Sequence, residues 1–267
     1  MSIGIAYAGL AALLYGVFLF VMKQWFDIYP SSVFILITYV LSFLVYLPAV
    51  IVSDTAFLSG PNLSNALGAI LAVTIGVTVG LMLVFRALQI GEVSYVSPIS
   101  KIIPVFVLPL EVGLLGQRLS ALQVGGVVVA TIAIYLANWQ GTTLLAPIKR
   151  ARQSRPAQLA LLSAVTFAFV DIGKRVLMQE LAIAPTTYIP VMFVGVSVLM
   201  GPLALRTHWP DEWWRDLPLF LVTALLVAVA NHMTLLAFQL QPASTVSPIV
   251  NGQAIVAVIL GAILLKE

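Results

Sequence analysis

The chain has 267 residues, of which 61% are hydrophobic and only 9% are charged, and its mean hydropathy is +1.08. Soluble domains carry about 25% charged residues, so this composition excludes an ordinary water-soluble enzyme, a disordered chain and a nucleic-acid-binding protein. The formal net charge of +3 is too small to indicate a polyanionic partner. The sequence contains no cysteine, which excludes disulfides and thiolate metal sites. We therefore expect a polytopic membrane protein.

Nine apolar runs are long enough to cross a membrane, for which a helix needs about 20 residues. The predicted spans are Ile3–Met22, Val33–Val52, Leu67–Phe85, Ser94–Leu115, Leu119–Ala137, Gln158–Met178, Thr187–Leu205, Leu217–Leu240 and Thr245–Leu265. Several joints contain Pro, Gly, Ser or Asn, which are typical of turns between helices. The first run has no basic segment before it, so we interpret it as a retained helix rather than a secretory signal.

Two segments of the chain repeat one pattern at an offset of 150 residues. Residues 87–99 read ALQIGEVSYVSPI and residues 237–249 read AFQLQPASTVSPI, and the shared Gln, Ser and Pro are hard to obtain by chance in so apolar a sequence. We interpret the chain as two copies of one unit. Residues 1–140 form the first five-helix repeat, residues 141–156 a basic linker, and residues 157–267 a second repeat with four helices present.

The sequence ends where a counterpart of Leu119–Ala137 is expected. We therefore expect a tenth helix to be missing at the C-terminus, and a true nine-helix protein is the alternative. Because five is an odd number, the second copy must enter the membrane from the opposite side. Such inverted-topology repeats are common in secondary transporters, whose halves rock about a central site. A duplication that merely enlarged the bundle is the other interpretation.

The repeated unit also carries a set of short motifs in a fixed order. They are Ala87-Leu88-Gln89, Ser97-Pro98-Ile99, Pro104, Leu114-Leu115-Gly116-Gln117-Arg118-Leu119 and Gln123-Val124-Gly125-Gly126. This order resembles the drug/metabolite transporter superfamily, specifically its EamA-like ten-helix exporters. Gln117 stands where that family usually has Glu, whereas Glu267 keeps the acidic residue in the second copy.

The resemblance implies a ten-helix fold with a central cavity between the two halves. It implies transport of small organic molecules such as amino acids, other metabolites or drugs. It also implies that the first, third, fourth, sixth, eighth and ninth helices contribute to the cavity. The resemblance does not identify the substrate.

The fourth predicted span carries a stripe of polar residues on one face, because its members follow three-four spacing. The stripe is Ser94, Ser97, Lys101, Pro104, Leu108 and Glu111, and its counterparts in the ninth span are Ser244, Ser247, Asn251, Ala254, Val258 and Gly261. The ammonium of Lys101 would hold a carboxylate or phosphate of a substrate, or exchange a proton. The alternatives are an ion pair with Asp171 or Glu111 and snorkelling to the nearer interface.

Other polar residues lie in predicted spans, where an ionisable side chain is costly unless it faces a cavity or a partner. The predicted substrate-binding residues are Lys101, Ser97, Ser247, Asn251, Asn231, His232 and Tyr15, and the candidates for coupling or ion pairing are Asp171, Glu111 and Lys174. Asp171 either pairs with Lys174 or Arg175 at helical spacing or carries a proton. His232 either changes its charge near neutral pH or is a neutral packing residue.

Proline and glycine predict the local shape of the helices. Kinks that expose backbone carbonyls near the polar stripe are expected at Pro98, Pro104, Pro109 and Pro248. Gly76 and Gly80 form a Gly-x-x-x-Gly pattern, which predicts a neighbouring helix at close range.

The sequence contains neither a phosphate-binding Gly-x-x-x-x-Gly-Lys loop nor a His-Glu-x-x-His helix. We therefore expect no nucleotide-driven motor, no zinc protease and no cofactor. Eight basic residues fall on the side of the linker and three on the other, which predicts a cytoplasmic linker and an external N-terminus. The family resemblance instead implies that both termini are internal.

We expect a secondary transporter, an exporter of small organic metabolites such as amino acids, in a prokaryotic cytoplasmic membrane. Alternating access around the cavity between the repeats is the expected mechanism, driven by the substrate gradient or by proton exchange. The expected partners are a small-molecule substrate and the lipid bilayer. A lipid-carrier flippase is the alternative, followed by a non-transport membrane subunit and an intramembrane enzyme.

Overall fold

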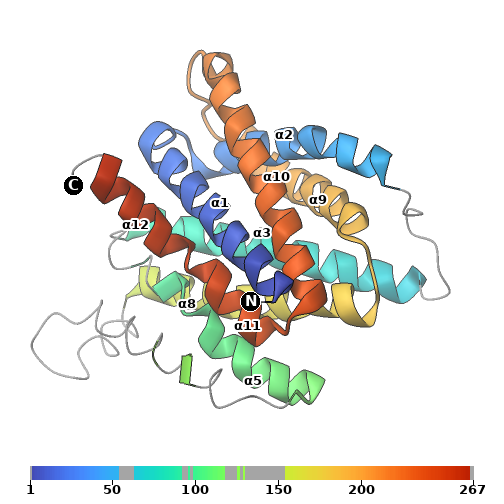
Figure 1. The fold of residues 1–267 in the computed structure, drawn as a ribbon. Coiled ribbons are helices and arrows are strands. Elements are labelled where there is room, and N and C mark those ends of the chain that lie inside the picture. The colour runs from blue at the N-terminus through green and yellow to red at the C-terminus, as the bar shows by residue number, and fades with distance from the viewer. Residues whose placement is uncertain are drawn as a thin grey trace, which may run out of the picture.

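The protein is an all-helical bundle in the computed structural model, which describes residues 2–53, 63–91, 99–117 and 154–264 and the single residues 96, 125, 126 and 129. No β-strand occurs in these ranges (Figure 1). Within the described residues, seven helices are long and apolar enough to cross a membrane, and a shorter apolar helix, Ile103–Leu115, accounts for an eighth predicted span. The predicted all-α membrane fold is therefore confirmed.

The described helices follow the chain order of the predicted spans. The N-terminal half contains α1 (Ile3–Trp25), α2 (Ser31–Val52), α3 (Leu63–Ile90) and α5 (Ile103–Leu115). The C-terminal half contains α8 (Arg155–Arg175), its π-helical continuation η1 (Val176–Glu180), α9 (Pro185–Leu205), the 3-10 turn η2 (Trp213–Asp216), α10 (Leu217–Leu240), α11 (Ala243–Asn251) and α12 (Gln253–Leu264). Most of the predicted span Leu119–Ala137 and most of the linker lie outside the described residues.

The two halves interleave instead of forming separate lobes. Helix α1 packs against α10 and α12, and its counterpart in the second half, α8, packs against α3 and α5. Because α3 and α10 are equivalent, as are α5 and α12, these contacts are two copies of the same arrangement. Helices α2 and α9, which are also equivalent, pack against each other (Figure 1). The contacts therefore have the pairwise symmetry that the repeat predicts, and the interior lies between the halves.

The two spans that carry the polar stripe are broken at the same point. In the second half, a turn at Gly252 separates α11 from α12, and the Gly252 N–H donates to the carbonyls of Pro248 and Ile249 at 3.2 and 3.0 Å. In the first half, a turn at Lys101 precedes α5, and the Ile102 N–H donates to Ile99 at 3.3 Å. Because proline has no N–H to continue a helical ladder, such breaks are expected beside it. Breaks thus occur beside Pro104 and Pro248 as predicted, whereas α5 continues through Pro109 without a break and Pro98 lies outside the described residues.

Glycines let neighbouring helices approach closely. A Cβ atom on Gly80 would lie 2.9 Å from the ring of Phe167 in α8, and one on Gly76 would lie 2.8 Å from Val170 in the same helix. The close packing predicted for Gly76 and Gly80 is therefore confirmed. Gly16 of α1 is tighter still, since its Cβ would lie 2.5 Å from Val256 of α12 and 3.0 Å from the backbone carbonyl of Gln253.

The contact at Gly16 provides a test of this packing. Gly16→Ala is expected to lower the free energy of unfolding by about 1–3 kcal/mol, because the added methyl group meets the backbone of α12 as well as a side chain. Gly9→Ala on the same helix is the control: nothing lies within 4 Å of its Cβ position, and alanine favours the helix by up to about 1 kcal/mol. Thermal unfolding in detergent measures both variants, and equal stability of the two would contradict the packing described here.

Candidate functional site

A group of polar side chains lies where helices from both halves meet. The Tyr15 hydroxyl of α1 faces Thr234 of α10, and it interacts electrostatically with Tyr39 of α2, Asp171 of α8 and Tyr188 of α9. Thr234 and Tyr188 are 3% and 0% exposed. We call the central cluster the set formed by Tyr15, Tyr39, Lys101, Asp171, Lys174, Tyr188, Thr234 and Ser247. It draws on five of the long helices together with the broken spans.

Asp171 supplies the negative charge of the central cluster. Its carboxylate interacts with the ammonium of Lys174, with the hydroxyl of Ser247, which is 1% exposed, and with the ammonium of Lys101. In the described ranges, ion pairs join Arg175 to Glu111 and Glu180, and Arg215 to Glu212, and none joins a lysine directly to Asp171. The cluster thus holds two ammonium groups that each interact electrostatically with one carboxylate without forming a direct ion pair.

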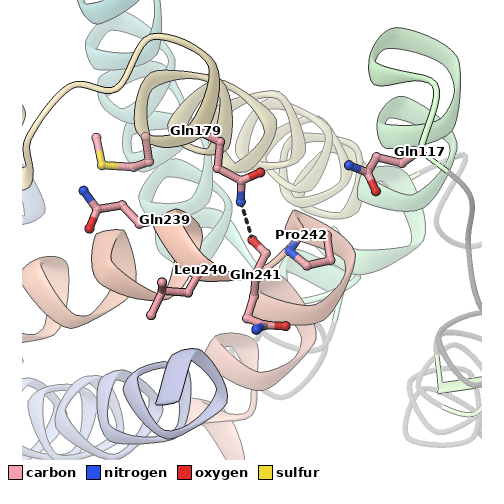
Figure 2. Close-up of a pocket in the computed structure, with 7 residues that line it drawn as sticks. Gln117, Gln179, Gln239, Leu240, Gln241 and Pro242 are labelled. Carbon is pink, nitrogen blue, oxygen red and sulfur yellow. Dashed lines mark hydrogen bonds between the residues drawn. The ribbon is translucent and has the colours of Figure 1, made fainter. Parts of the chain in front are cut away.

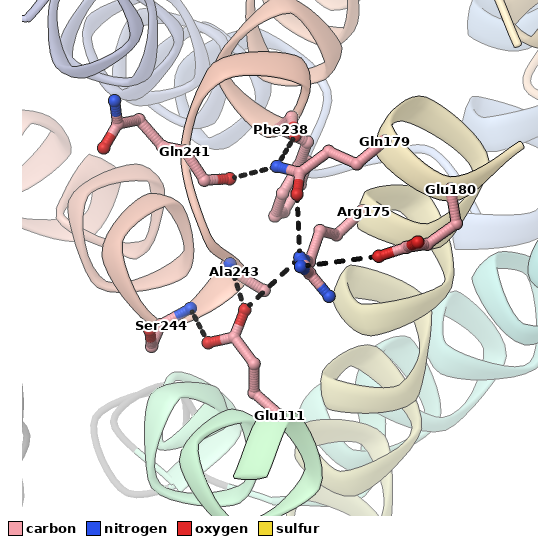
Figure 3. A network of polar contacts seen from close by, with 8 residues as sticks. All are labelled: Glu111, Arg175, Gln179, Glu180, Phe238, Gln241, Ala243 and Ser244. Atoms are coloured by element: carbon pink, nitrogen blue, oxygen red, sulfur yellow. Dashed lines mark hydrogen bonds and ion pairs between the residues drawn. The ribbon is translucent and has the colours of Figure 1, made fainter. Parts of the chain in front are cut away.

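A second polar network ties the two halves together at one end of the bundle. Glu111 of α5 is fully buried, and its carboxylate accepts the backbone N–H groups of Ala243 at 2.7 Å and Ser244 at 2.8 Å (Figure 3). These are the first two residues of α11, so the carboxylate occupies the positive end of that helix. Arg175 of α8 pairs with the same carboxylate at 3.7 Å. We call Glu111, Arg175 and the first turn of α11 the clamp.

Gln179 extends the clamp toward the end of α10. The Arg175 Nε donates to the Gln179 side-chain carbonyl at 3.1 Å, and the Gln179 Nε2 donates to the carbonyls of Phe238 at 2.6 Å and Gln241 at 3.0 Å (Figure 3). Arg175 also pairs with Glu180 at 3.6 Å. This network joins α5, α8, η1, α10 and α11, so that movement of one half relative to the other must break it.

Two pockets flank these networks. Beside the clamp, a polar pocket of about 380 Å³ is lined by Gln117, Met178, Gln179, Gln239, Leu240, Gln241 and Pro242 (Figure 2). An apolar pocket of about 240 Å³ lies between α2 and α10, where the Tyr46 hydroxyl and His232 Nδ1 are 2.6 Å apart. The residues of the central cluster line neither pocket.

The structure brings five of the residues predicted from the sequence into the central cluster. They are Tyr15, Lys101, Asp171, Lys174 and Ser247. Asn251 lies at the break after α11 and donates to the carbonyl of Ser247 at 2.8 Å and to its hydroxyl at 3.3 Å. It is therefore adjacent to the cluster and holds one of its members in place.

The remaining predicted residues lie elsewhere. Asn231 is 5% exposed and donates to the Val227 carbonyl of its own helix at 2.9 Å. His232 lines the apolar pocket with Tyr46, and Glu111 belongs to the clamp. Ser97 lies outside the described residues.

Sequence reasoning did not single out two tyrosines of the cluster or the extent of the clamp. Tyr39 and Tyr188 were indistinguishable from packing aromatics, although a hydroxyl in the middle of an apolar span is a signal. The Tyr188 hydroxyl faces Thr74, and in the described ranges neither oxygen makes a hydrogen bond. Buried polar atoms without partners are uncommon in folded proteins and indicate a place for water or a ligand.

Comparison with known proteins reproduces the two-copy organisation. The model of the EamA-like transporter family matches residues 2–139 and again residues 155–267. A solved structure titled "Crystal structure of protein" superposes with a TM-score of 0.79 at 13% sequence identity, covering 100% of this chain and 90% of that one. At this identity the similarity shows a shared fold. No curated protein matches the sequence.

The clamp predicts unequal effects of two identical substitutions. Arg175→Met removes the buried partner of Glu111 and is expected to lower the free energy of unfolding by about 3 kcal/mol. Arg215→Met is the control, because it removes an arginine whose side chain is 71% exposed and pairs with Glu212, and an exposed pair contributes less than about 1 kcal/mol.

Denaturation in detergent micelles measures both variants. Glu111→Ala combined with Arg175→Met should cost less than the sum of the single changes, since the two side chains share one network. Equal losses for the two arginine variants, or strict additivity at Glu111 and Arg175, would contradict the clamp.

Proposed function

The chain belongs to the EamA-like transporter family, and we propose that it exports small organic metabolites, amino acids above all, by alternating access around the central cluster. Membership of this family makes it an integral, multi-pass membrane transporter, in agreement with the apolar helices. Its substrate class, its direction and the residues that act are our proposal. The charges of the central cluster are the observation that carries it.

The charge balance of the cluster favours a solute with a carboxylate. Lys101 and Lys174 contribute two positive charges and Asp171 one negative charge, which leaves a formal excess of one positive charge. Uncompensated charge in a membrane interior costs several kcal/mol. A bound carboxylate at Lys101 would balance the excess. The ammonium group of an amino acid would then face Asp171.

The tyrosines of the cluster can contact the ammonium group and the side chain of an amino acid. Tyr15, Tyr39 and Tyr188 come from three helices and both halves, and each offers an aromatic face and a hydroxyl. An aromatic face attracts an ammonium group and also accepts apolar side chains. The unpartnered hydroxyls of Tyr188 and Thr74 add hydrogen-bonding capacity. Three rigid rings favour a small solute over a large one.

The broken helices provide further electrostatic support. Helix α5 begins at Ile103, two residues after Lys101, so its positive N-terminal end lies next to the proposed carboxylate site. The matching break in the second half lies next to Asn251 and Ser247. Discontinuous helices whose ends face the substrate recur in transporters built from inverted repeats.

Alternating access follows from the symmetry of the contacts. Because the packing of α1 on α10 and α12 is repeated by α8 on α3 and α5, the two halves can tilt either way with similar loss of contact. In this proposal the clamp closes one end of the carrier. The other end of the carrier lies on the far side of Lys101 from the clamp. We place the protein in a prokaryotic cytoplasmic membrane, with protons as a candidate coupling ion at Asp171.

A lipid-carrier flippase is the alternative function, and it requires a lateral site for a phosphate head group. The apolar pocket beside Tyr46 and His232 contains no lysine or arginine among its described lining residues. Phosphate recognition in proteins relies on such cations. Among the described residues, the cations that lie within the bundle are in the central cluster and the clamp, which favours a soluble metabolite over a lipid.

Transport by reconstituted protein tests the proposal. Lys101→Gln is expected to reduce uptake of radiolabelled amino acids into proteoliposomes at least tenfold, because loss of a carboxylate contact of about 1.5–3 kcal/mol weakens binding by that factor or more. Asp171→Asn should reduce it similarly. Lys23→Gln, the same change at an exposed position near the end of α1, should leave uptake unchanged.

Two further observations complete this test. His232→Gln should transport normally, since its side chain lies in the apolar pocket and outside the cluster. Unfolding midpoints of all variants must match that of the unaltered protein, so that a loss reports on binding. Undiminished transport by a folded Lys101→Gln protein would overturn the role of the central cluster.

A further inference from the structure

The polar pocket beside the clamp has an unusual lining. Four glutamines meet there from four places in the fold: Gln117 after α5, Gln179 in η1, Gln239 in α10 and Gln241 at the joint to α11 (Figure 2). Its volume of about 380 Å³ lies in the range of small-molecule sites. Among the residues that the structure describes, none that lines it is charged. We call it the glutamine pocket.

The chemistry of this lining selects an uncharged polar group. Each glutamine amide offers two N–H donors and one carbonyl acceptor. In the described ranges, the side chains of Gln117 and Gln239 make no hydrogen bond with the protein. A carboxamide is the complementary ligand group, because it can donate to one glutamine and accept from another. A carboxylate or an ammonium group would find no opposite charge among the described residues of the lining.

The backbone around Gln179 is built in a way that sets the direction of this residue. Residues 176–180 form a π-helical turn in which the Leu181 N–H bonds to Val176 at 3.0 Å, and Ala182 follows with a φ of 51°. Such turns are rare and recur at functional sites, and a positive φ at alanine is a strained conformation. A regular continuation of α8 would have placed Gln179 on another face of the helix.

Gln179 belongs to both the glutamine pocket and the clamp. Its Nε2 is held by the carbonyls of Phe238 and Gln241, and its carbonyl oxygen accepts from Arg175, whose other buried partner is Glu111 (Figure 3). The Gln179 carbonyl oxygen has two lone pairs, so a ligand N–H that bonds to it shares this acceptor with Arg175 and weakens the bond from Arg175. When the hydrogen bond from Arg175 to Gln179 weakens, the guanidinium is held less firmly in place. Its ion pair with the Glu111 carboxylate, which binds the first turn of α11, then weakens as well.

We infer that the glutamine pocket is a second binding site, which accepts a carboxamide group of a small solute and loosens the clamp through Gln179 when it is occupied. This inference rests on the proposed function only for its consequence, which is opening of that end of the carrier. The site itself, and its link to the clamp, stand on the contacts described above.

The absence of native cysteine allows a direct test, because an introduced thiol is the only one in the protein. Gln239→Cys reports on the glutamine pocket, and Ser244→Cys, at a residue that is 4% exposed and bound to Glu111, reports on the clamp. Ser163→Cys is the control, since Ser163 is buried and bonds to Gly80 on α3, away from both. The probe is butyramide, and the isosteric anion butyrate is its charged counterpart.

Butyramide is expected to slow maleimide labelling of purified Gln239→Cys by about fivefold at four times its dissociation constant, as simple occupancy requires. It should accelerate labelling of Ser244→Cys and leave Ser163→Cys unchanged. Butyrate should do none of these. In Ser244→Cys combined with Gln179→Leu, labelling should be fast and independent of butyramide, because the link to Arg175 is absent.

Each other result overturns part or all of the inference. Labelling of Gln239→Cys that is unaffected by butyramide up to its solubility limit removes the binding site, and Gln117→Cys repeats this measurement if the first variant fails to fold. Protection of Gln239→Cys with no change at Ser244→Cys removes the link to the clamp. Equal protection by butyrate removes the carboxamide preference.

The assay needs no transport, so failure of amino-acid uptake would remove the proposed function and leave these results interpretable.

Discussion

The buried carboxylate of Glu111 is the contact on which the closed end of this protein depends. It links α5 of one half to α11 of the other, and Arg175 of α8 compensates its charge. A carboxylate in an apolar interior is tolerable only when its oxygens are fully hydrogen-bonded, and two backbone N–H groups at a helix start meet that demand. The contact is therefore strong while it is complete and costly to leave half-made. Such an all-or-none contact suits the proposed role of the clamp, which is either fully formed or fully broken as that end of the carrier closes or opens.

The central cluster obeys a different constraint. Its charges come from two lysines and one aspartate that do not pair directly, so the electrostatic balance is incomplete within the protein. The charges of the clamp pair with one another, whereas in our proposal a solute completes the charge balance of the cluster. This contrast distinguishes the clamp from the proposed binding site more clearly than the identity of the residues does, since both contain a carboxylate and a cation.

Much of the fold could be predicted because membrane burial constrains sequence strongly. Apolar runs gave the helices, the 150-residue offset gave the repeat, and prolines in the polar spans indicated the breaks beside Lys101 and Asn251. The partners of polar side chains could not be predicted, because helical periodicity fixes the face of a residue and not the neighbour that meets it. Glu111 was thus considered as an ion-pair partner of Lys101, and it binds the start of α11, more than a hundred residues away. The π-turn that directs Gln179 left no recognisable signal in the sequence.

The backbone is nearly symmetric, but the side chains are not. Lys101 corresponds to Asn251 and Glu111 to Gly261, and at an offset of 151 residues Asp171 corresponds to Phe20, so the charged groups of these three pairs are confined to one member of each. In the proposed mechanism, the two tilted arrangements of the halves would therefore be similar in shape and unequal in energy. In the absence of solute, the carrier would rest with its clamped end shut. Its apparent affinities on the two faces of the membrane would then differ, while the solute gradient alone would still fix the final distribution.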